Sequence, residues 1–204
     1  MARIRVNNKY THQYCKALVI VHGASEYQIV RYVKSKLRLP LEIYSKYNGQ
    51  KSIQINGLKS LLEKSGDFNK QKKFLKKYSN IQFSKEGLMN FKLFPIMDTD
   101  DCTNKTKEEY IDGTLFDGHW LKPYIISIYN SPSLEDVLFD CKLIKKNLKN
   151  CDKTSTYQNL FPINRSSSNY DEIDELYNRL LKSKKTNFEE FIKYCLDWAN
   201  ENKL

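Results

Sequence analysis

Polar side chains that can do chemistry follow three separate apolar runs of this sequence. They are His22, Glu26, Asp98, Asp100, Asp101 and Glu135. Clustered carboxylates repel one another unless a cation lies among them, and Mg²⁺ or Mn²⁺ prefers carboxylate oxygens together with water or phosphate. We therefore expect a divalent-metal site with Glu26, Asp98, Asp100 and Asp101 as its ligands. The alternative for segment 98–101 is a solvated acidic loop.

The same residue types suit acid–base chemistry at a metal centre. The predicted catalytic residues are His22, Glu26, Asp98, Asp100 and Glu135. An imidazole titrates near neutral pH, so His22 can donate a proton or bind a softer ion such as Mn²⁺. The alternative for His22 is a partly buried histidine held by hydrogen bonds.

Apolar patterning predicts alternating strands and helices that would position these residues. Short β-branched or aromatic runs predict strands at residues 17–21, 41–44, 91–97 and 124–129. Helical spacing of apolar residues predicts helices at 26–39, 58–62, 64–85, 134–144, 171–182 and 187–200. This alternation is typical of α/β proteins, whose ligands bind beyond the carboxyl ends of parallel strands. We expect a parallel-rich sheet of about four strands flanked by helices, with the polar residues at one edge.

Some segments are less regular. Pro95 lies inside the predicted strand 91–97, where its missing N–H is awkward for a central strand. Ser133 is a plausible N-cap for the helix that follows it, with Asp136 three residues on. Segment 150–169 is polar and contains the predicted loop Arg165-Ser166-Ser167-Ser168-Asn169. We expect an α/β domain over 1–150 and a helical C-terminal extension over 151–204 that packs on it.

The order of these motifs resembles the Toprim domain of OLD- and RloB-type antiphage nucleases. That family ends its first strand in E-G-x-[ST]-[DE], and this chain has His22-Gly23-Ala24-Ser25-Glu26. The D-x-D of the family matches Asp98-Thr99-Asp100. Segment 130–135 (NSPSLE) resembles the S-N-P-x-x-E segment of RloB-like proteins with its first two residues transposed.

The resemblance implies a Toprim-like fold and Mg²⁺- or Mn²⁺-dependent cleavage of DNA or RNA in antiphage defence. It also implies a partner ATPase or another defence-system protein. His22 stands where the family has a glutamate that acts as a metal ligand or general acid/base. The alternative is therefore a catalytically degenerate module that binds nucleic acid or a partner protein as a sensor or regulator.

A second enzyme class shares one of these motifs. Asp98-Thr99-Asp100 after an apolar strand also resembles the start of haloacid-dehalogenase-type phosphatases, where Asp98 would be the nucleophile. Cys102 stands where that family has threonine or valine, and only about half the chain follows the motif. The motifs of P-loop, dinucleotide-binding and serine-hydrolase folds are absent from the sequence.

The charge of the chain favours an anionic partner. It has 34 Lys and Arg against 24 Asp and Glu, a net charge of +10. Lysines are frequent in segment 64–85 and in the series Lys142, Lys145, Lys146, Lys149 and Lys153, which we expect on helices that flank the acidic strand ends. There they can contact phosphates without reading sequence, or simply form a solvated face. The predicted nucleic-acid-binding residues are Lys72, Lys73, Lys76, Lys77, Lys145, Lys146 and Arg165.

Composition narrows the class of protein further. With 40% apolar residues and 13% aromatic residues, the chain can bury a core without disulfides or a structural metal. The five cysteines include no C-x-x-C pair, so we expect reduced thiols. No apolar run is long enough for a membrane span or a signal peptide, so we expect a cytoplasmic protein that does not enter membranes.

Overall fold

A four-stranded, all-parallel sheet forms the centre of the protein. The computed structural model describes residues 14–145, 150–163 and 169–201. In spatial order the strands are β2 (Glu42–Tyr44), β1 (Ala17–Val21), β5 (Lys92–Asp98) and β6 (Ile128–Asn130). The register pairs Val21 with Ile96 and Asp98 with Asn130, so β1, β5 and β6 end at the same edge of the sheet. The expected α/β fold with a parallel sheet flanked by helices is confirmed.

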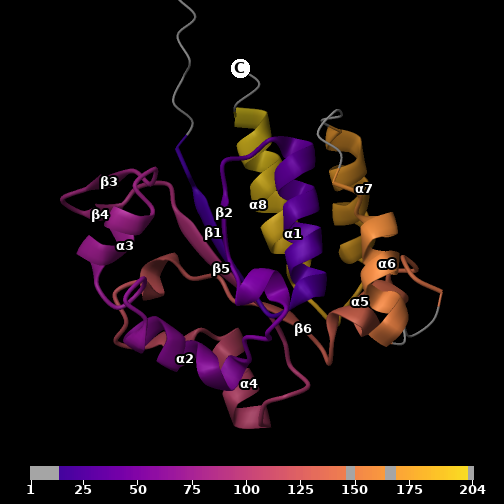
Figure 1. Ribbon diagram of the computed structural model, residues 1–204, viewed down its shortest axis with the longest axis horizontal. Coiled ribbons are helices and arrows are strands. Elements are labelled where there is room, and N and C mark those ends of the chain that lie inside the picture. Colours follow the sequence, from indigo (N-terminus) through magenta and orange to yellow (C-terminus); the bar gives the residue numbers. More distant parts are fainter. Residues whose placement is uncertain (1–13, 146–149, 164–168, 202–204) are drawn as a thin grey trace, which may run out of the picture.

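Helices cover both faces of this sheet (Figure 1). Ala17, Val19 and Val21 of β1 point into a core formed with α1 (Ala24–Leu37), α7 (Tyr170–Leu180) and α8 (Phe188–Glu201). Leu18 and Ile20 point to the opposite side. There they pack in a core with α2 (Ile55–Lys64), α3 (Gln71–Lys77) and α4 (Asn104–Ile111). Because successive residues of a strand face opposite sides, β1 is apolar throughout.

The long basic helix predicted over 64–85 is wrong in extent. Only α3, Gln71–Lys77, is helical, and a small hairpin of β3 (Phe83–Ser84) and β4 (Gly87–Leu88) follows it. The chain turns before α3, where Ser65 Oγ accepts a hydrogen bond from the Asp67 N–H. Phe68 after this turn and Phe74 within α3 both enter the core, so the apolar residues do not form one helical stripe.

Pro95 lies in the central strand β5, and a buried tyrosine hydroxyl contacts its carbonyl oxygen. β6 pairs with β5 only from Ile96 onward, so the predicted strand 124–129 is mostly irregular and includes part of a 3₁₀ turn, η3 (Lys122–Tyr124). The hydroxyl of Tyr110 on α4 lies 2.8 Å from the Pro95 carbonyl oxygen and 2.9 Å from that of Ile128. The Tyr110 hydroxyl thus joins α4 to carbonyl oxygens of the two neighbouring strands β5 and β6.

The C-terminal part is helical, as expected, and it includes a helix that the sequence patterning does not predict. α6 (Asn150–Leu160) occupies part of the polar segment 150–169, and Gln28 Nε2 of α1 donates to the Phe161 carbonyl just after it. α5 (Leu134–Asp140) begins at the predicted N-cap, where Ser133 Oγ accepts from the Asp136 N–H. Side chains from α5 to α8 enter the same core as β1 and α1.

Two further observations bear on the sequence expectations. Within the described part of the chain, no helix has the length and apolar character needed to cross a bilayer. The cysteines whose side chains are described carry free thiols, namely Cys15, Cys102, Cys141 and Cys195.

Candidate functional site

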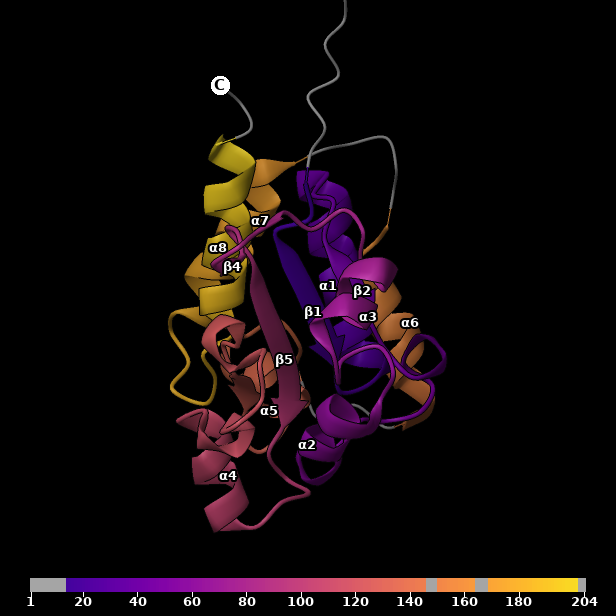
Figure 2. The ribbon, with the colours of Figure 1, turned by 90° about the vertical axis from the view of Figure 1, so that its left-hand side faces the viewer.

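A cavity of about 400 Å³ lies beyond the carboxyl ends of β1 and β5. It is rich in charged side chains, and its lining includes His22, Glu26, Ser52, Asp98, Asp100, Ser133, Glu135, Asp136 and Lys153. In Figure 2 the arrowhead of β5, which marks its carboxyl end, lies beside α5. This is the edge at which α/β proteins bind their ligands, and it gathers five of the six acidic or imidazole residues predicted from the sequence.

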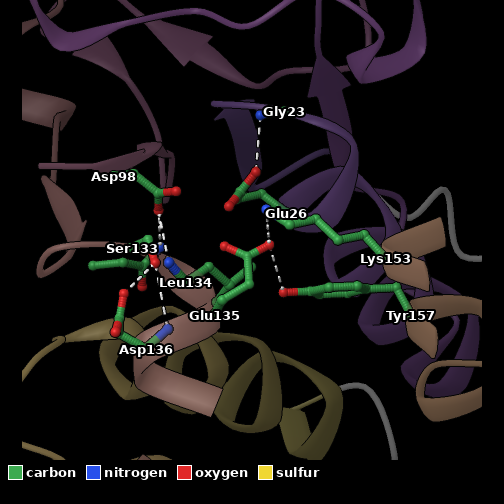
Figure 3. Close-up of polar contacts among 10 residues, drawn as sticks. Gly23, Glu26, Asp98, Ser133, Leu134, Glu135, Asp136, Lys153 and Tyr157 are labelled. Atoms are coloured by element: carbon green, nitrogen blue, oxygen red, sulfur yellow. Dashed lines mark hydrogen bonds and ion pairs between the residues drawn. The ribbon is translucent and has the colours of Figure 1, made fainter. Parts of the chain in front are cut away.

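Glu26 is in the first turn of α1 and is 2% exposed. Its carboxylate accepts a hydrogen bond of 2.8 Å from the Gly23 N–H at the helix start (Figure 3). Burial raises the pKa of Glu26 to about 7, and the nearby charge of Glu135 also raises it. Because burial disfavours the ionised form, Glu26 is a carboxyl group that exchanges its proton near neutral pH.

Asp98 ends β5 and is 7% exposed. Its Oδ1 accepts two hydrogen bonds, from Asn130 Nδ2 at 3.1 Å and from the Leu134 N–H at 3.0 Å. Burial, followed by the charge of Glu26, raises the pKa of Asp98 to about 8. Figure 3 shows the carboxyl groups of Asp98 and Glu26 facing each other across the cavity.

The position of Asp98 depends on a chain of buried polar contacts. Asn130 is fully buried, and its Oδ1 accepts a hydrogen bond of 3.0 Å from Thr186 Oγ1. The amide orientation is therefore fixed, with its nitrogen directed at Asp98. A side chain held this way keeps one geometry when a ligand enters or leaves.

Glu135 and Lys153 form an ion pair of 3.0 Å inside the cavity (Figure 3). The Tyr157 hydroxyl, on the same helix as Lys153, lies 3.4 Å from Glu135. Burial and then the charge of Glu135 raise the pKa of Tyr157, which keeps this hydroxyl a neutral donor. Sequence reasoning names Lys153 only as one of a series of lysines near the strand ends, and it does not single out Tyr157. The helix that carries both residues reveals their place beside Glu135.

His22 and the acidic segment after β5 differ in whether their side chains line the cavity. His22 lines the cavity, and its buried Nδ1 has no hydrogen-bond partner in the described part of the chain. Asp100 also lines it and is exposed. Asp101 is not among the lining residues, although Asn56 Nδ2 donates to its carbonyl oxygen at 3.0 Å.

The loop between β2 and α2 closes one side of the cavity and supplies Ser52. The Asn48-Gly49 pair is a turn, as its residues suggest, and Gly49 has φ +86°. A Cβ atom at Gly49 would lie 2.8 Å from the Gly23 carbonyl oxygen. Glycine is therefore required for the loop to lie against the start of α1.

The donor atoms of the cavity fit a hard divalent cation. In the described ranges, no three His, Cys, Asp or Glu side chains converge closely enough to form a ready-made metal cage. Mg²⁺ does not need one, since it commonly binds through one or two carboxylates and keeps several waters. Glu26 and Asp98 are two such carboxyl groups, and burial together with negative neighbours raises the pKa of each, to about 7 and about 8. A cation between them would relieve that repulsion.

The predicted nucleic-acid-binding lysines lie away from this cavity. Lys72, Lys73, Lys76 and Lys77 are exposed on α3. Phe74 of that helix contacts Phe91, which precedes β5, so α3 lies toward the amino ends of the strands. The expectation that this helix flanks the acidic strand ends is therefore wrong. Lys145 is exposed after α5, and Lys146 and Arg165 are outside the described residues.

Comparison with models of protein families, with curated proteins and with solved structures finds no match for this chain.

Proposed function

We propose that the protein is a metal-dependent phosphodiesterase that cleaves DNA or RNA. The observation that carries this proposal is the pair Glu26 and Asp98. They are two buried carboxyl groups from different elements, with pKa values of about 7 and about 8, that face each other where parallel strands end. Proteins seldom bury two facing carboxyl groups unless a cation or a shared proton is part of their function.

Glu26 and Asp98 would hold Mg²⁺ or Mn²⁺. Asp100 and Glu135 line the same cavity, so they would accept hydrogen bonds from the waters bound to that ion. When bound, such an ion polarises a phosphoryl oxygen and lowers the pKa of a coordinated water. Asp98 is prevented from turning away by Asn130 and the Leu134 N–H. The side chain of Asp101 does not line the cavity, so we assign it no direct role.

The cationic residues of the cavity have a separate task. Lys153 is paired with Glu135 and is 34% exposed, so its ammonium group can contact an entering phosphate without leaving the cavity. His22 lies beside it in the same cavity, and its imidazole can donate a proton to a leaving oxygen. These two residues supply the positive charge and the proton that phosphodiester cleavage requires.

The direct test is cleavage of plasmid DNA and of a long RNA in Mg²⁺ and in Mn²⁺. We expect wild-type protein to cut one of them and the Asp98→Ala and Glu26→Gln variants to lose at least about 100-fold in rate. Asp67→Ala is a matched control, because it removes a carboxylate that pairs with Lys77 outside the cavity. Cutting that persists in the Asp98→Ala variant would overturn the assignment of the site.

A second candidate is a binding module without catalytic activity. The ion pair between Lys153 and Glu135 favours it, because an ammonium group already supplies a cation inside the acidic cavity. No cutting with either metal, together with retained binding to nucleic acid or a partner protein, would select this candidate. The raised pKa of Asp98 weighs against a phosphatase in which this carboxylate is the nucleophile, since a protonated carboxyl group is a poor one.

A further inference from the structure

The acidic cavity opens into a longer groove along α1. A second cavity of about 550 Å³ shares Ala24, Ser25 and Lys153 with it. A third cavity, of about 480 Å³, shares Tyr27 and Arg31 with the second. The three hollows therefore follow one another along α1, from its first turn to Arg38 at its end, and we call this row the groove.

The chemistry of the groove changes along its length. The middle cavity contains no acidic residue and has four side-chain amides, those of Gln28, Asn48, Gln50 and Gln158. The far cavity contains Arg31, Lys34 and Arg38, with Glu42 as its one acidic residue in the described chain. A ligand in this groove would meet carboxylates at one end, amides in the middle and guanidinium groups at the other end.

Two arginines of the far cavity lack an acidic partner in the part of the chain that the structure describes. Among the described residues, neither Arg31 nor Arg38 forms an ion pair, and both are exposed. The Arg31 guanidinium lies 5.4 Å from the centre of the Tyr27 ring, which holds it along the groove. Arg38 ends α1 in the left-handed conformation, φ 53°, a position where glycine is the usual residue.

We infer that this groove binds a single strand of nucleic acid that leads into the acidic cavity. The inference rests on the proposed function for what happens at the acidic end, but it makes a separate claim about binding. Arginines suit phosphates, and side-chain amides suit the Watson–Crick edges of bases, which only an unpaired strand exposes. α1 is about 21 Å long at 1.5 Å per residue, which is the length of about six stacked nucleotides.

This assignment moves the binding surface away from the lysines of α3. A matched pair of double variants separates the two surfaces, since Arg31→Gln/Arg38→Gln and Lys72→Gln/Lys73→Gln each remove two exposed charges. Binding is measured by fluorescence anisotropy with labelled 12-nucleotide DNA and RNA strands, in EDTA so that no metal-dependent cleavage occurs. Circular dichroism of each variant checks that the fold is intact.

We expect the arginine variant to weaken binding by about tenfold or more and to lower the salt slope by about 1.4, at about 0.7 for each lost phosphate contact. The lysine variant should bind within about twofold of wild type. Equal effects of the two variants, a larger effect of the lysine variant, or no binding by wild type would overturn the proposal that the groove binds nucleic acid.

Failure of the groove and failure of the proposed function give different results. If the wild type binds as expected but cuts nothing, the groove stands and the phosphodiesterase proposal fails. If the wild type cuts and the arginine variant cuts with unchanged KM, the proposal that the groove binds the substrate fails and the phosphodiesterase proposal stands.

Discussion

Replacing Asp98 with asparagine should stabilise the protein at neutral pH. Asparagine keeps the shape of the side chain, and its Oδ1 can still accept hydrogen bonds from Asn130 and the Leu134 N–H. What it removes is the ionisable carboxyl group that burial and Glu26 hold at a pKa of about 8. A site kept for binding a cation commonly costs stability in this way.

The size and sign of this change in stability follow from the pKa values of Asp98 in the folded and in the unfolded protein. An ordinary aspartate has a pKa of 3.8, against about 8 in the folded protein. At pH 7 the folded state therefore binds a proton that the unfolded state has released, so this residue makes stability fall as pH rises from about 4 to about 8. Each pH unit in that range lowers the free energy of unfolding of the wild type by about 1.4 kcal/mol. The Asp98→Asn variant does not have this loss, so its stability relative to wild type should increase by up to about 4 kcal/mol between pH 4 and pH 7.

Urea denaturation of both proteins at pH 4 and pH 7, without divalent metal, measures this gain. Asp100→Asn is the matched control, because it makes the same chemical change at an exposed carboxylate of the same cavity and should shift stability by less than about 0.5 kcal/mol. A pH-dependent gain for Asp98→Asn below about 1 kcal/mol, or a loss, would refute the view that a strained carboxyl group lies at this position.

Three further changes test other parts of the structure. Gly49→Ala should cost about 1–3 kcal/mol in urea denaturation, because its φ is +86° and the new Cβ would meet a backbone oxygen. Gly57→Ala, in open space on α2, should instead raise the free energy of unfolding by up to about 1 kcal/mol. Equal effects of the two substitutions would contradict the view that a side chain at position 49 strains the backbone. Lys153→Met should raise the pKa of Glu26 further in an NMR titration, since Lys153 lowers it, and an unchanged value would show that the ammonium group is too distant to matter. Tyr110→Phe should cost about 0.5–1.5 kcal/mol, because it removes a buried hydroxyl that hydrogen-bonds the sheet; no loss would mean that this hydrogen bond adds nothing to stability.

The parts of the fold with strong apolar periodicity could be predicted from the sequence. β1 has the predicted bounds, Ala17–Val21, and α1, α7 and α8 begin within about two residues of prediction. α6 could not be predicted, because its sequence is mostly polar and its contacts with α1 come from few large side chains such as Tyr157. Helices of this kind form because a neighbouring surface is available, which local spacing does not reveal.

The candidate site shows the same division. His22, Glu26, Asp98 and Glu135 could be predicted to meet, because each follows a strand and parallel strands end together. The place of Lys153 could not, since it reaches the cavity from a helix that the sequence patterning misses. The lysines of α3 stand out in the sequence, yet a run of charges does not say on which side of a sheet its helix packs.

The contact between Asn130 and Thr186 also sets the order in which the protein can become functional during its synthesis. Asp98 is directed by Asn130, and Asn130 is oriented by a residue that lies 186 − 98 = 88 positions after Asp98. At about 5–20 residues per second, a ribosome needs about 4–18 s to make that stretch. A nascent chain that already contains every acidic residue of the cavity therefore still lacks the contact that orients Asn130 toward Asp98, and the cavity is complete only after the loop before α8 is made.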